Sequence, residues 1–208
     1  KNGYNGSLRA GIDSRAKVNL GGDINIRQNK INFFASGSYN QRKSISTSYA
    51  GTNFFTTTPL KVISNSENTS NGYFAFLRGG FDYFIDNRNT ISFTANLNKG
   101  NFKTDGLQKI DTTSSSIVSN TNRSTFSEMN FENFGGQLSY KHNFSKNGHS
   151  ISADANYNSS TNSSLSDIGS LIYTSAGSQK YPYYQLRGDG NGSNKFFTLQ
   201  TDYENQLT

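Results

Sequence analysis

The chain has 208 residues and a formal net charge of +6, and 32% of its residues are hydrophobic. A mean hydropathy of −0.71 would suggest disorder, but an aromatic content of 13% and only two prolines argue against it. The lack of cysteine excludes disulfides and thiolate chemistry. Lysine and arginine are scattered among acidic residues rather than gathered in one stripe, which does not favour nucleic-acid binding.

Period-two alternation of polar and apolar residues predicts eight β-strands along the chain. They cover residues 4–12, 17–27, 31–40, 73–85, 91–102, 131–144, 151–159 and 195–206. In the second of them, Val18, Leu20 and Ile24 occupy one parity and polar residues the other. Side chains on a strand alternate between its two faces, so each predicted strand has one apolar and one polar face.

A hairpin pattern recurs within this series. Its three copies read GGDINIRQNKINFFASGSYN from Gly21, GGFDYFIDNRNTISFTANLN from Gly79 and GGQLSYKHNFSKNGHSISADANYN from Gly135. The rising strand begins at Ile31, Ile91 and Ile151, so the period is 60 residues (91 − 31 and 151 − 91). A fixed period of this size indicates a repeating supersecondary unit.

The predicted connections alternate in length. Three are short turns, at residues 28–30, 86–89 and 145–148, whereas residues 44–72, 105–130 and 160–194 are predicted to be long polar loops. Short turns on one rim and long loops on the other are typical of outer-membrane barrels, in which only alternate strand residues meet lipid. The predicted fold is therefore all-β, an antiparallel up-and-down transmembrane β-barrel. A soluble β-sandwich is the alternative, although its strands would average about 5–6 residues.

Aromatic residues lie at two levels of the predicted strands. Phe33, Phe93 and Phe144 lie near the short turns, and Tyr39 and Tyr157 lie near the long connections. Two such levels are expected where a protein meets both interfaces of a bilayer.

Several segments resemble a known family. GYNGSLRAGI, KVNLGGDINIRQNKINFFASGSYNQRKS, DYFIDNRNTISFTANLNKGNF and GGQLSYKHNFSKNGHSISADANYNSS are similar to the outer-membrane β-barrel family of TonB-dependent receptors of the Bacteroidetes type. The similarity covers most of the predicted strands and little of the loops. It implies the N-terminal part of a barrel of about 22 strands, preceded by a plug domain. The family's plug and energy-coupling motif match no residue here.

The resemblance leaves two forms of the barrel open. Residues 1–208 are expected to be one outer-membrane barrel domain that is partial, because an open sheet cannot lie in lipid and the chain ends at Leu207 and Thr208 without a terminal aromatic residue. Alternatively, the eight strands close on themselves, since barrels of that size exist.

The candidate functional residues are aromatic. Tyr173, Tyr181, Tyr183 and Tyr184 fall in the last predicted loop, where they either stack on a ligand or pack the loops together. We expect no enzymatic activity, because His142 and His149 lie near a turn without an evident catalytic motif. No cofactor and no metal ligand are predicted.

The resemblance implies part of a nutrient-importing barrel in the bacterial outer membrane, a multi-pass protein with a plugged lumen. Its implied partners are the lipid bilayer, a plug domain of the same parent chain, periplasmic TonB, and a surface lipoprotein or other outer-membrane subunits. One alternative is a structural or scaffold barrel in a larger assembly. A third is a soluble adhesin-like β-sandwich.

Overall fold

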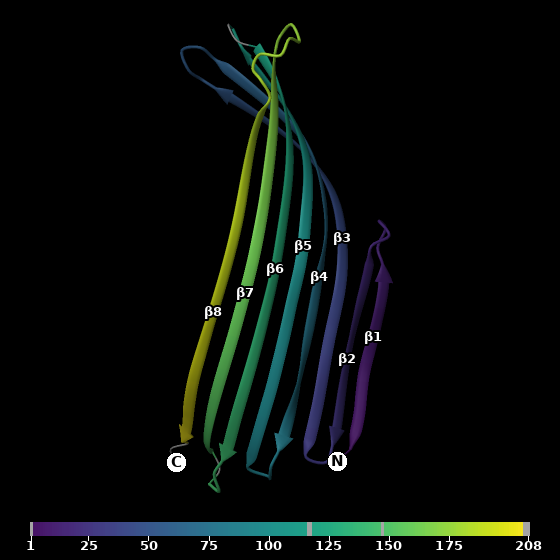
Figure 1. The fold of residues 1–208 in the computed structure, drawn as a ribbon, viewed down its shortest axis with the longest axis vertical. Helices are drawn as coiled ribbons and strands as arrows, with labels where there is room; N and C mark the ends of the chain where they lie inside the picture. The colour runs from purple at the N-terminus through teal and green to yellow at the C-terminus, as the bar shows by residue number, and fades with distance from the viewer. Residues whose placement is uncertain (1, 116–117, 147, 206–208) are drawn as a thin grey trace.

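The computed structural model describes residues 2–115, 118–146 and 148–205. They form one antiparallel sheet whose spatial order, β1 to β8, is the order of the strands in the sequence (Figure 1). The strands are β1 (Gly3–Ile12), β2 (Val18–Gln28), β3 (Ile31–Phe54), β4 (Leu60–Phe84), β5 (Asn89–Ser114), β6 (Val118–Asn143), β7 (His149–Thr174) and β8 (Tyr184–Asn205). The predicted all-β, up-and-down antiparallel architecture is confirmed.

The strand boundaries at the short turns also match the predictions closely. β3 begins at Ile31 as expected, and the turns before β5 and β7 lie within one residue of their predicted positions. Gln206, the predicted end of the last strand, and Asn147, in the last short turn, lie outside the described residues. The short turns after β2, β4 and β6, the start of β1 and the end of β8 lie on the same rim of the sheet (Figure 1).

The three long loops are the main error of the sequence prediction. Residues 44–54 and 60–72 pair with each other as the continuation of β3 and β4. Residues 105–114 and 118–130 continue β5 and β6, and residues 160–174 and 184–194 continue β7 and β8. The connections that remain include residues 55–59 and 175–183.

These extensions make the central strands long. β5, β6 and β7 have 26 residues each, which corresponds to about 85 Å at 3.3 Å per residue. The hydrocarbon core of a bilayer is only about 30 Å thick. β1 and β2 have 10 and 11 residues and end at about half the height of their neighbours (Figure 1). The sheet therefore has a lower half of eight strands and an upper half of six.

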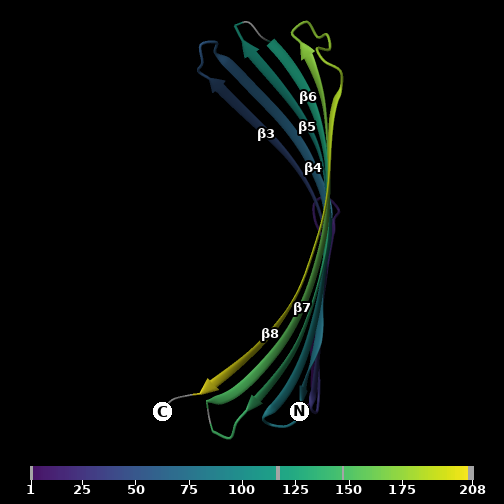
Figure 2. The same cartoon turned by 60° about the vertical axis from the view of Figure 1, so that its left-hand side comes forward.

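The sheet is a single curved layer (Figure 2). Among the described residues no hydrophobic side chain is buried, and large apolar side chains such as Leu8, at 93%, are almost fully exposed. β1 and β8 do not pair with each other in the described structure, so each leaves one edge open. Neither a two-layered sandwich nor a closed eight-stranded barrel is formed. A single layer has no core of its own, so its surroundings must cover its apolar surface.

None of the described residues forms a helix that is long and apolar enough to cross a membrane.

Candidate functional site: the two faces of the sheet

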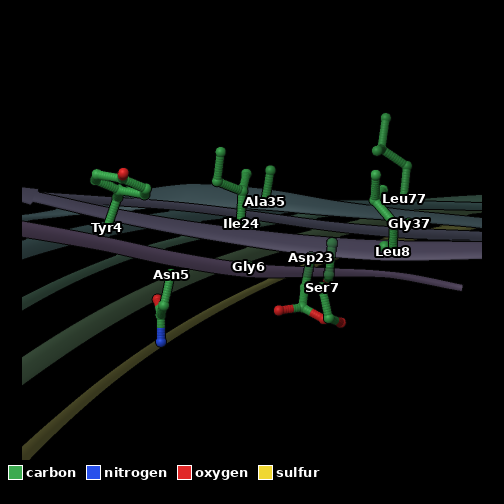
Figure 3. Close-up of a pocket in the computed structure, with 12 residues that line it drawn as sticks. Tyr4, Asn5, Gly6, Ser7, Leu8, Asp23, Ile24, Ala35, Gly37 and Leu77 are labelled. Atoms are coloured by element: carbon green, nitrogen blue, oxygen red, sulfur yellow. The ribbon is translucent and has the colours of Figure 1, made fainter.

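The register of the sheet assigns every strand residue to one of two faces. Directly paired residues of adjacent antiparallel strands lie on the same face. Tyr4 pairs with Ile26, Ile26 with Phe33 and Phe33 with Phe81, and this relation continues across all eight strands. Figure 3 shows Tyr4, Ile24 and Leu77 on one side of the ribbon, with Asn5 and Asp23 on the other. The later strands curve toward the side of Asn5, so we call this side the concave face and the opposite side the convex face.

The lower half of the convex face is an apolar band without a charged side chain. We define the band by residues 4–12, 18–26, 31–39, 75–83, 91–97, 134–140, 151–157 and 197–203, taking only those that lie on the convex face. Exposed side chains of the band include Leu8, Leu77 and Leu199, at 93%, 57% and 70%. Between Tyr4, Ile24 and Leu77 the glycine positions leave an open apolar hollow of about 660 Å³ (Figure 3).

Aromatic rings lie near both limits of this band. Toward the short turns, Phe81 packs against Phe33 and Phe93, with ring centroids 6.2 and 5.9 Å apart. Toward the upper half, Tyr39 packs against Tyr73 at 5.7 Å. The two predicted aromatic levels are therefore present on one face, where an apolar band between aromatic girdles is typical of a membrane-facing barrel wall.

Charged side chains lie mainly on opposite faces in the lower and the upper half of the sheet. In the lower half, charged strand residues lie on the concave face: Arg9, Asp23, Arg27, Arg78, Asp82, Lys141, Asp154, Asp202 and Glu204. In the upper half they lie on the convex face: Lys43, Lys61, Glu67, Lys99, Lys103, Asp105, Lys109, Asp111, Glu128, Glu132, Asp167, Arg187, Asp189 and Lys195. On the concave face of the described upper half, the only charged side chains are Arg42 and Arg123.

The boundary on the convex face carries an ionic network between β5 and β6. Lys99 Nζ lies 3.0 Å from Glu132 Oε2, and Lys103 Nζ lies 3.3 Å from Glu128 Oε1. Between them the amide of Asn101 donates to Glu128 at 2.7 Å. The hydrogen bond to Glu132 raises the pKa of Lys99, and the Asn101 amide, aided by Lys103, lowers the pKa of Glu128. The network is exposed, so it marks a solvated surface rather than a strong source of stability.

On the concave face of the lower half, neighbouring strands donate hydrogen bonds to carboxylates. Ser92 and Asn32 donate to Asp82 at 2.7 and 3.3 Å, and Asp154 accepts hydrogen bonds from Ser139 and Gln137. The guanidinium of Arg27 lies 4.5 Å from the centroid of the Phe84 ring. Charges of both signs therefore line this face without forming a selective ring of one sign.

The structure distributes the four predicted tyrosines rather than grouping them. Tyr173 lies near the end of β7 on the convex face, and Tyr184 begins β8 on the concave face. Tyr181 and Tyr183 belong to the connection, where both are about half exposed. The hydroxyl of Tyr183 occupies the space above Gly169, on the convex side. A role of these residues in binding ligand stays a prediction.

The sequence reasoning missed a cluster of phenylalanines on the concave face. Phe74, Phe102 and Phe131 lie just above the level of the apolar band, on the face that carries most of the polar residues of the lower half. The centroid of Phe131 lies 6.2 Å from that of Phe102 and 6.2 Å from that of Phe74. A signal was present in the sequence, because apolar residues of the polar parity recur beside glycines in Gly72-x-Phe74 and Gly100-x-Phe102.

The two histidines near the last short turn belong to the rim of the sheet. His142 Nδ1 lies 2.7 Å from Asn89 Oδ1, which also accepts a hydrogen bond from the Tyr140 hydroxyl at 2.6 Å. Asn89 in turn donates to Asp86. His149 begins β7 and pairs with Asn205. These contacts fasten the rim of the sheet.

No family model matches the chain, and no curated protein sequence matches it. Among solved structures, a double mutant of the Serratia marcescens hemophore receptor HasR, in complex with its hemophore HasA and heme, is 9% identical with a TM-score of 0.15. That match covers 96% of this chain and 41% of HasR, so the chain spans less than half of that receptor. OccK8 (OprE) of Pseudomonas aeruginosa is 8% identical with a TM-score of 0.13, and the match covers 96% of each chain. At these TM-scores the matches do not establish a shared fold.

Proposed function

We propose that this chain forms part of the wall of an outer-membrane transport barrel, with its convex face toward lipid and its concave face toward a gated lumen. The observation that carries the proposal is the change of faces by the charged residues. In the lower half the convex face carries no charged side chain, whereas in the upper half it carries almost all of the charged side chains. A wall that crosses a bilayer and continues into water needs this distribution, because a charged side chain facing lipid at the midplane is destabilising.

The dimensions of the sheet agree with this assignment. β1 and β2, with 10 and 11 residues, have the length that a tilted strand needs to cross a membrane, about 9–11 residues. The upper halves of β3 to β8 then form a sheet that rises above the outer surface. In this orientation the short turns, the start of β1 and the end of β8 lie on the periplasmic side.

The open edges support a larger barrel. The described sheet leaves one edge of β1 and one edge of β8 without a partner strand. Unpaired backbone groups are costly in lipid, so barrels that cross membranes are closed. Further strands of the parent protein would close the wall, as expected for a member of the TonB-dependent receptor family with a plug domain, TonB as periplasmic partner and a Bacteroidetes-type source. The proposal gives this chain no enzymatic role.

Transport can be tested by placing larger side chains on the concave face of the complete protein, which would narrow the lumen. The amides of Asn96 and Asn158 lean over Gly135, 2.5 and 2.9 Å from where a β-carbon would lie, so Asn96→Trp and Asn158→Trp place bulk in the lumen. Leu97→Trp, on the convex face, is the matched control. Uptake is measured in cells with and without the protein, for a neutral oligosaccharide, a short peptide and an iron chelate.

If the protein is a transporter, uptake of at least one solute falls when it is removed. The wild type and Leu97→Trp restore that uptake, and the Asn96→Trp, Asn158→Trp double variant does not. Uptake that is independent of the protein for all three solutes would instead favour a scaffold barrel.

A further inference from the structure

The phenylalanine cluster of the concave face has the geometry of a binding platform. Phe102 and Phe131 are nearly parallel, with an interplanar angle of 16°, and Phe74 is inclined to Phe131 by 32°. The three residues come from β4, β5 and β6, so their rings form one surface across three strands. We call Phe74, Phe102 and Phe131 the aromatic platform.

Glycines on the neighbouring strands let these rings lie against the sheet. Gly100 pairs with Phe131, and a β-carbon at Gly100 would lie 2.5 and 2.6 Å from Cε1 and Cζ of that ring. Gly72 pairs with Phe102 in the same way, and a β-carbon there would collide with that ring. The rings of Phe102 and Phe131 thus each extend over a residue without a side chain. Phe74, Phe102 and Phe131 are each only partly buried.

The surroundings of the platform combine apolar and uncharged polar side chains. Met129 pairs with Phe102, and Phe76 lies in the row below Phe74. That lower row also contains Asn98, Asn133 and Ser160, and the row above Phe102 contains Ser70 and Thr104. Ser160 donates to Asn133 Oδ1 at 2.5 Å, which directs the N–H groups of the Asn133 amide away from Ser160. Amides and hydroxyls both donate and accept hydrogen bonds, so they suit a ligand rich in hydroxyl groups.

Two arginines are the charged groups of the described concave face that lie nearest to the platform. Arg42 lies at its rim, where it pairs with Gly72, and Arg78 lies four residues along β4 from Phe74, or about 13 Å. Since no carboxylate on this face of the described strands lies as near, a cationic ligand finds no partner there. A polyanion would have only two nearby cations for many charges.

We infer that the aromatic platform is a binding site for an uncharged oligosaccharide. The apolar faces of sugar rings would stack on Phe102 and Phe131, and their hydroxyls would exchange hydrogen bonds with Asn98, Asn133 and the neighbouring serines. Arg42 would act as a hydrogen-bond donor at the rim. The site lies above the apolar band on the concave face, where a solute would arrive before it enters the membrane-spanning part. This inference rests on the proposed function for its access route.

The test measures binding to the complete protein in detergent by titration calorimetry. The probes are neutral hexasaccharides of α1,4-, β1,4- and β1,3-linked glucose, β1,4-linked mannose and β1,4-linked xylose. A hexamer of galacturonic acid and an uncharged hexapeptide are the comparison ligands. Phe131→Ala and Phe102→Ala remove rings of the platform, Phe131→Tyr keeps the ring, and Phe93→Ala removes a ring from the convex face.

The inference predicts that at least one neutral hexasaccharide binds and that each alanine variant of the platform weakens binding about tenfold or more, a loss typical of a stacked aromatic contact. Phe131→Tyr and Phe93→Ala should stay within about threefold of wild type. Resistance of each variant to unfolding in detergent gel electrophoresis checks that the barrel is intact.

Failure to bind any neutral hexasaccharide would overturn the inference, as would preferential binding of the peptide or of the galacturonate, or binding that is insensitive to Phe102 and Phe131. Because this assay measures binding and not uptake, its result is separate from the transport test. If the protein imports only the peptide or the iron chelate, the inference that the platform binds an oligosaccharide is wrong, and the transport proposal still holds.

Discussion

Leu97 and Lys99 lie two residues apart on the same face of β5, and the limit of the apolar band falls between them. Leu97 pairs with Leu77 and Phe134, both large and apolar, whereas Lys99 pairs with Ala75 and with Glu132, and forms an ion pair with Glu132. Along one strand the environment thus changes from an apolar surface to a charged one within one strand period. We interpret this step as the level at which the wall leaves the membrane.

Charge should be tolerated very differently on the two faces at mid-height of the band. Ala95 lies on the convex face between Phe93 and Leu97, and Asn96 lies on the concave face. We expect Ala95→Arg to destabilise the complete protein by about 2–4 kcal/mol relative to Ala95→Leu, because an arginine there must enter lipid. Asn96→Arg should change the free energy of unfolding far less. A urea titration in lipid vesicles measures both, and equal effects of the two arginines would contradict the assignment of faces.

The ring of Phe131 should limit the size of the side chain that position 100 tolerates. A β-carbon at Gly100 would overlap the ring, so Gly100→Ala should destabilise the protein by about 1–3 kcal/mol. Phe131→Ala in the same chain should remove most of this effect, since the space of the ring becomes free. Gly188→Ala is a matched control in β8, where a β-carbon meets nothing within 4 Å. Strictly additive effects of Gly100→Ala and Phe131→Ala in a double-mutant cycle would show that the ring does not cause the restriction.

The turn between β4 and β5 should loosen in acid. Asp86 accepts hydrogen bonds from the backbone N–H groups of Arg88 and Asn89, at 2.7 and 2.8 Å, and from the side chain of Asn89. The Arg88 N–H, followed by the Asn89 side chain, lowers the pKa of Asp86 below its ordinary value of 3.8.

A carboxylate with a lowered pKa in the folded state stabilises that state above its unfolded pKa and loses this effect as the pH falls through the folded value. Exchange of the Arg88 and Asn89 amide protons should therefore be slow above about pH 4 and become faster, after correction for the intrinsic rate, as the pH drops further. Asp86→Asn should abolish most of this pH dependence. If amide exchange in Asp86→Asn depends on pH as it does in the wild type, Asp86 does not cause the loosening.

The sequence predicted the lower half of the sheet well because one physical signal dominates there. In β2, Val18, Leu20 and Ile24 share one parity and polar residues such as Asn19 and Asp23 the other, so the apolar face is visible without any knowledge of the partner strands. The repeat of the hairpin supplied the order of the strands. The same signal located both aromatic levels.

The upper half could not be predicted in this way because lipid no longer imposes an apolar face. In β7, residues 160–170 are mostly Ser, Thr, Asn and Asp, and their extended conformation depends on backbone pairing with β6 and β8. Such pairing is set by neighbours far away in the sequence. The platform was missed for a related reason, since Phe102 and Phe131 come together only through the register of β5 with β6.

The most direct test of the central claim follows solvent access along the convex face of β5. The chain has no cysteine, so single substitutions of Phe93, Ala95, Leu97, Lys99 and Lys103 by Cys each introduce a unique thiol in this segment. Each variant of the complete protein, in intact outer membranes, is treated with a membrane-impermeant maleimide and, in parallel, with a lipid-soluble one. The account predicts that the impermeant reagent fails at positions 93, 95 and 97 and reacts at 99 and 103, while the lipid-soluble reagent labels the first three. Ready labelling of positions 93 and 95 by the impermeant reagent, or protection that continues through 103, would contradict it.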